Sequence, residues 1–105
     1  MDELDADPQM TFAIAEHDAT AVVTINGELD ISNVWQLEAA VTPVLLAGVR
    51  HLVLELADLT FADSSAIAVW VRWASSVDDL HLNGVSPLLR TVIQTMGLAG
   101  RLKLQ

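Results

Sequence analysis

The chain lacks cysteine, is poor in basic side chains and has no long apolar run. Without cysteine it has no disulfide bonds and no thiolate metal sites. No apolar run approaches the roughly 20 residues that a membrane-spanning helix needs. The N-terminus has no basic, apolar-cored signal peptide. These absences agree with a cytoplasmic location, which is the location that we expect.

Positive charge is scarce, with 5 Lys and Arg against 14 Asp and Glu, giving a net charge of −9. Such a charge opposes nonspecific binding to nucleic acid or to anionic lipid, so we expect neither partner. The simplest explanation of the charge is that it keeps a small domain in solution, and a basic protein partner is the alternative. Several of the acids lie within the first seven residues. We therefore expect an acidic, flexible tail at 1–10 and a single domain at 11–105. The 52% hydrophobic content of the whole chain fits a compact fold.

Hydrophobic periodicity divides the domain into strands and helices. Expected strands lie at 11–17, 20–26, 51–56 and 80–83, with a possible final edge strand at 101–104, and expected helices at 32–47, 64–75 and 86–96. Glycine and acids at 27–30 are expected to end the second strand. The order is ββαβαβα, possibly with a final β. It predicts an α/β fold, a small mixed sheet of four to five strands with three helices packed mainly on one face.

Polar side chains gather in the loops that should follow the parallel strands, where α/β sheets bind their ligands. These residues are Glu28, Asp30, Asp63, Ser64, Ser65 and Ser86. The same loops hold no lysine, arginine or histidine, so a serine nucleophile would lack a base. The histidines have no metal-ligand spacing and the glycines form no phosphate loop. We expect a recognition surface, not an enzyme, with no metal and no cofactor.

Asp63, Ser64 and Ser65 open the expected helix at 64–75. Asp and Ser are the residue types that cap helices, because their oxygens accept the first N–H groups. A phosphate would also be received favourably there, at the positive end of the helix dipole. From these residues alone, the serine pair is either a cap or a modification site.

Three segments at compatible spacing resemble a STAS domain of the anti-sigma factor antagonist type. They are 26–30 after the second strand, 52–66 ending in the sequence Phe-Ala-Asp-Ser-Ser-Ala, and 85–87 with the helix that leads to 96–98. The resemblance spans residues 12–102.

The resemblance implies partner switching. In that family, an anti-sigma factor that is itself a serine kinase phosphorylates the serine after the aspartate, which here is Ser64. The unmodified antagonist captures the anti-sigma factor and frees the sigma factor, whereas the phosphorylated antagonist releases its partner. The residues expected to contact the partner are Glu28, Asp30, Asp63, Ser64, Ser65, Ala66, Trp73 and Ser86. Trp73 is included because it lies off the apolar stripe of Ile67, Trp70, Val71 and Ala74, whereas Trp70 is expected in the core.

Two features differ from the antagonist pattern. Ala66 stands where glycine is usual, and the segment 74–79 is short. Both are similar to a second STAS subfamily, the small cytoplasmic subunit of phospholipid-transporting ABC systems, which regulates the transport ATPase. That role is the alternative to the antagonist.

Overall fold

The computed structural model describes residues 9–104 of the chain. The strands are β1 (Met10–His17), β2 (Thr20–Leu29), β3 (His51–Glu55), β4 (Leu59–Ala62), β5 (Asp79–Asn83) and β6 (Lys103–Leu104). The helices are α1 (Val34–Leu46), α2 (Ser64–Ala74) and α3 (Pro87–Thr95). Most of the expected tail lies outside the described residues. Met10, which we had assigned to the tail, instead opens β1 and is buried.

The expected mixed α/β architecture is confirmed. The strands form one sheet in the order β1-β2-β3-β5-β6, in which β1 and β2 pair antiparallel and the other neighbours pair parallel. The sheet has six strands, so the expectation of four to five was too low. The additional strand is β4, which pairs with β2 off the main path.

β4 corrects the prediction that 27–30 ends the second strand and that 57–63 is a loop. β2 pairs with β3 through Thr20–Thr24 and with β4 from Gly27 to Leu29. The β2–β4 pairing is irregular, because Gly27 pairs with Leu59 and Glu28 with Phe61, which leaves Thr60 of β4 as a bulge. Gly27 has a φ of 91°, and its N–H donates to the Asp58 carbonyl over 2.9 Å. β2 therefore continues beyond residue 26 because β4 replaces β3 as its partner.

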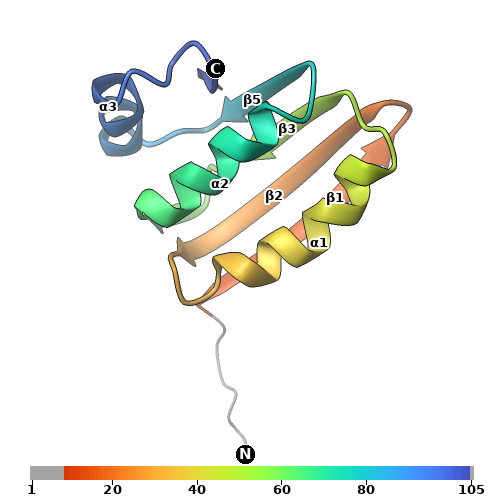
Figure 1. The fold of residues 1–105 in the computed structure, drawn as a ribbon. Coiled ribbons are helices and arrows are strands. Elements are labelled where there is room, and N and C mark those ends of the chain that lie inside the picture. Colours follow the sequence, from red (N-terminus) through yellow and green to blue (C-terminus); the bar gives the residue numbers. More distant parts are fainter. Residues whose placement is uncertain (1–8, 105) are drawn as a thin grey trace, which may run out of the picture.

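α1 and α2 lie side by side over one face of the sheet, and α3 lies at the end of the sheet, beyond the carboxyl end of β5 (Figure 1). Alternating leucines of β3 and β5 are buried beneath the helices, as expected. α3 is anchored in the core by the fully buried Ile93. The opposite face of the sheet carries polar pairs between β3 and β5: His51 is hydrogen-bonded to Asp79 over 3.1 Å, and Asn83 donates to Glu55 over 2.9 Å.

The inward face of α2 corrects the expectation for Trp73. Trp70 is fully buried, as expected, but Trp73 is also buried, at 4% exposure. Ile67 is buried as expected, but the buried stripe also takes in Ala66, Val69 and Trp73. Its centre therefore lies about one residue earlier than that of the expected stripe. Trp73 is therefore a core residue and is not available at the surface to a partner.

Candidate functional site

Asp63 caps α2 and fixes the start of the helix. Its Oδ1 accepts hydrogen bonds from the backbone N–H groups of Ser65 and Ala66, at 3.0 and 3.2 Å. These are among the N–H groups that a helix leaves without an internal partner. The carboxylate of Asp63 therefore occupies the position that an anion would otherwise take at this helix end.

The two serines after Asp63 differ in their surroundings. The Ser65 hydroxyl is half-buried and donates to Asp63 Oδ1 over 2.5 Å. Ser64 is exposed, and its hydroxyl makes no hydrogen bond with any residue in 9–104. Ser65 is thus part of the cap, whereas Ser64 presents its oxygen to the solvent.

The pKa of the Asp63 carboxyl lies below its ordinary value. Partial desolvation acts to raise this pKa, but the hydrogen bonds from the Ser65 hydroxyl and from the N–H groups of Ala66, Ile31 and Ser65 together lower it by more. Asp63 is therefore negatively charged at neutral pH. A second negative group on Ser64 would lie beside a fixed charge.

The loop between β2 and α1 is attached to the same carboxylate. Asp63 Oδ2 accepts from the N–H of Ile31 over 3.2 Å. Within the loop, Asp30 Oδ1 accepts from the Ser32 hydroxyl and N–H, and the buried Asn33 donates to the Glu28 carbonyl over 2.8 Å. These bonds fix the loop against the start of α2.

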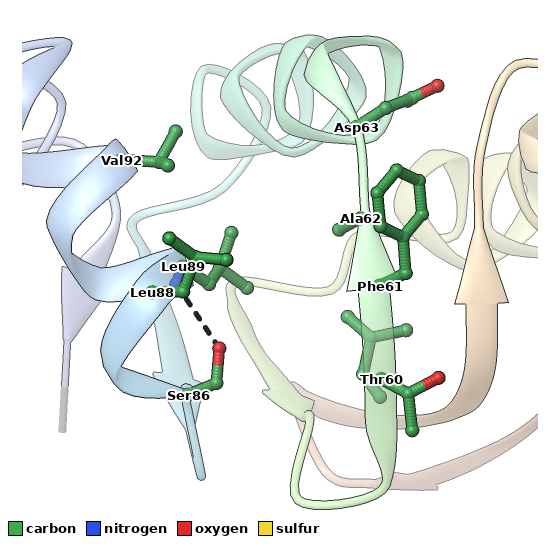
Figure 2. Close-up of a pocket in the computed structure, with 9 residues that line it drawn as sticks. Thr60, Phe61, Ala62, Asp63, Ser86, Leu88, Leu89 and Val92 are labelled. Carbon is green, nitrogen blue, oxygen red and sulfur yellow. Dashed lines mark hydrogen bonds between the residues drawn. The ribbon is translucent and has the colours of Figure 1, made fainter.

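An apolar groove lies between β4 and α3, next to Asp63 (Figure 2). Its volume is about 310 Å³. The lining residues are Leu59, Thr60, Phe61, Ala62, Asp63, Ser86, Leu88, Leu89 and Val92. Ser86 caps α3 by accepting from the Leu89 N–H over 3.2 Å, as expected. Ser86 and Asp63 thus border the same groove from two elements.

The structure brings most of the predicted site residues together. Asp30, Asp63, Ser64 and Ser65 meet around the start of α2, and Ser86 reaches this edge through the groove. Glu28 is exposed on β2, opposite Phe61 of β4. Ala66 is fully buried, so the expectation that its side chain contacts a partner is wrong: the position faces the core.

Sequence reasoning missed the apolar part of this surface. Ile31, Trp35, Phe61, Leu88, Val92 and Met96 are all exposed. The spacing of Leu88, Val92 and Met96, four residues apart on a helix, was a usable signal, because such residues share one face. Phe61 could not be placed without knowledge of β4.

Two kinds of site were not found. Within residues 9–104, no group of three or more His, Asp or Glu side chains is arranged to hold a metal ion. No helix in that range is long and apolar enough to cross a membrane. The candidate site is therefore described by its hydroxyls, its carboxylates and its apolar groove.

Comparisons with known proteins agree with this architecture. The chain is 28% identical over 80 residues to an anti-sigma-B factor antagonist of Staphylococcus aureus, a match that covers 72% of this chain and 74% of the relative. Its fold matches the crystal structure of an anti-sigma factor antagonist from Mycobacterium paratuberculosis, with a TM-score of 0.82, 24% identity and coverage of 96% and 89%.

The fold also matches that of the Bacillus cell fate determinant SpoIIAA in its phosphorylated form, with a TM-score of 0.73, 24% identity and coverage of 90% and 91%. A family model described as "Mlab, STAS domain" matches residues 12–105, which is nearly the whole chain. This match agrees with the mixed sheet and with the helix that Asp63 caps, and it shows that the chain belongs to the STAS domain family.

Proposed function

We propose that this chain is an anti-sigma factor antagonist that is switched off by phosphorylation of Ser64. Its partner is an anti-sigma factor that is also a serine kinase. The observation that carries the proposal is the contrast between two adjacent hydroxyls. Ser64 is exposed and makes no hydrogen bond with any described residue, whereas Ser65 is held by Asp63.

The relatives support a regulatory role. The Staphylococcus aureus relative is named an anti-sigma-B factor antagonist, and the matching SpoIIAA structure is of a phosphorylated protein. Sigma factors act in the cytoplasm, so the proposed role places the chain there. The role needs no base, metal or cofactor, because the chemistry of phosphoryl transfer belongs to the kinase.

Electrostatics explains how a phosphate on Ser64 would act as a switch. The phosphate adds about 1.5 to 2 negative charges next to Asp63. The Asp63 carboxylate already accepts hydrogen bonds from the N–H groups of Ser65 and Ala66, so these donors are not free to bind the phosphate. Attraction to the helix dipole returns only about 0.3–2 kcal/mol. The fold should therefore survive, whereas an interface that accommodates a small hydroxyl should not. Losing about 3–4 kcal/mol there weakens binding by two to three decades.

Phosphorylation is tested with the serine-kinase anti-sigma factor encoded in the same genome. The wild-type chain, Ser64→Ala and Ser65→Ala are incubated with the purified kinase and ATP, and the modified residue is mapped by mass spectrometry. We expect phosphate on Ser64 in the wild type and in Ser65→Ala, and none in Ser64→Ala. Modification of Ser65 or Ser86 alone, or none by a kinase that binds, would contradict the proposal.

Binding is tested by calorimetry with Ser64→Asp. We expect its affinity for the kinase to fall by roughly 100-fold or more, with unchanged circular dichroism. Ser76→Asp is the matched control, because Ser76 is an exposed serine just beyond the far end of α2. A stable complex with a phospholipid-transport ATPase, insensitive to Ser64→Asp, would favour the transporter-subunit role instead.

A further inference from the structure

α3 exposes an apolar stripe that the fold does not use. Leu88 is 76% exposed, and Val92 and Met96 follow at intervals of four residues on the same side. The helix is attached to the domain by other residues, chiefly the fully buried Ile93 and the half-buried Leu89. Exposed apolar side chains are common singly, but a contiguous set beside a groove marks an interaction site.

Across the groove, β4 contributes a second apolar wall. Leu59, Phe61 and Ala62 of β4 line the groove together with Leu88, Leu89 and Val92 of α3. Ala62 points toward α3, whereas the ring of Phe61, which is 52% exposed, lies on the other side of the β4 ribbon (Figure 2). The volume of about 310 Å³ exceeds the roughly 150 Å³ of a cavity that holds a benzene ring. The groove is therefore large enough for a leucine or an aromatic side chain from another molecule.

Charge around the groove indicates which molecule can enter it. Asp63 lines the groove. Glu28 of β2 and Arg90 of α3 are not among the lining residues. The charged residue that lines the groove is thus an acid, in a chain of net charge −9. A segment with an apolar anchor and basic flanks complements this charge.

The same charges disfavour the other candidate occupants. A second copy would bring two copies of this acid together, each on a chain of net charge −9. The chain's own residues 1–8 contain four acids and no basic side chain, so they are repelled by the same charge. A different protein with basic residues around an apolar side chain fits best.

We infer that the groove between β4 and α3 receives an apolar anchor side chain, flanked by Lys or Arg, from the anti-sigma factor that binds at Ser64. This inference rests on the proposed function and adds a second contact to it. Asp63 joins the two contacts, because it lines the groove and immediately precedes Ser64. A phosphate on Ser64 would therefore act at one end of the surface that the anchor occupies.

The test measures binding of the purified serine-kinase anti-sigma factor by calorimetry to the wild type, Leu88→Lys, Leu46→Lys and Ser64→Asp. Leu46 is the matched control, because it is 83% exposed and ends α1, far from α3 (Figure 1). We expect Leu88→Lys to weaken binding by roughly 10- to 30-fold, as for an interface anchor, and Leu46→Lys to change it by less than about twofold.

A second measurement does not depend on how a variant folds. In the wild-type chain, the NMR signals of the Leu88 and Val92 methyl groups should shift or broaden when the kinase is added, and those of Leu46 should not.

The outcomes separate this inference from the proposed function. If Leu88→Lys binds like the wild type and these methyl signals are unchanged while Ser64→Asp abolishes binding, the groove is not the anchor site and the proposed function stands. If the wild type does not bind the kinase, or Ser64→Asp binds as well as the wild type, the proposed function fails, and this inference with it.

Discussion

At the scale of single residues, Asp63 connects the start of α2 to the loop before α1. One carboxylate oxygen accepts hydrogen bonds from the N–H groups of the helix and from the Ser65 hydroxyl. The other accepts a hydrogen bond from the N–H of Ile31. The same residue thus orients Ser64 and fixes the loop beside it. A substitution at Asp63 should affect the stability of the domain and the shape of the proposed interface together.

We expect Asp63→Ala to lower the free energy of unfolding by about 1 kcal/mol, the typical cost of losing a helix cap. For a domain of this size, that corresponds to a melting temperature lower by roughly 4–8 °C. Asp58→Ala is the control, because Asp58 is exposed and its side chain makes no hydrogen bond within residues 9–104. Thermal unfolding of both variants checks this, and equal melting temperatures would contradict the capping role.

The lowered pKa of Asp63 also predicts how its contribution varies with pH. The folded-state pKa lies below the value of about 3.9 for an unfolded chain, so the carboxylate binds its proton less readily when folded. Its contribution to stability is present above the unfolded-state pKa and is lost as the pH falls through the folded-state pKa. The difference in stability between the wild type and Asp63→Asn should therefore shrink between neutral pH and about pH 3. Denaturant titrations measure it, and a constant difference would show that the charge is not involved.

At the scale of elements, Gly27 lies where β2 begins to pair with β4. A Cβ added at Gly27 would lie 2.1 Å from the Gln9 carbonyl oxygen, and the φ of 91° is strained for any other residue. Gly48, after α1, has a similar φ of 100° but open space around it. The two positions therefore separate the effect of backbone strain from that of steric contact.

We expect Gly27→Ala to destabilise the domain more than Gly48→Ala. Gly48→Ala should cost about 1–2 kcal/mol from the left-handed backbone alone, and Gly27→Ala should exceed it because the Gln9 backbone must also move. Urea titrations of both variants give the comparison. Equal losses would show that the strand next to Gly27 yields without cost.

The elements also show what a sequence can reveal. The hairpin, the three helices and the buried leucines follow from periodicity, and the caps at Asp63 and Ser86 from residue type. β4 was missed because it has only four residues and its pairing with β2 is irregular, with Thr60 left as a bulge. Trp73 was misplaced because an error of one residue in the phase of a helical stripe moves a side chain from the surface to the core. The groove was missed because it needs β4 and α3 in place together.

At the scale of the whole molecule, the charge of −9 should govern how fast the partner arrives, whereas the groove should govern how long it stays. The negative field attracts a basic partner before contact. Salt screens this attraction, because the Debye length falls from about 30 Å at 0.01 M salt to about 8 Å at 0.15 M. Stopped-flow binding of the kinase should show an association rate that falls by about tenfold or more over this range, with little change in dissociation. Leu88→Lys is compared with Leu46→Lys, because both add one positive charge, and it should dissociate faster at a similar association rate. A salt effect confined to dissociation would contradict steering, because long-range attraction acts before contact is made.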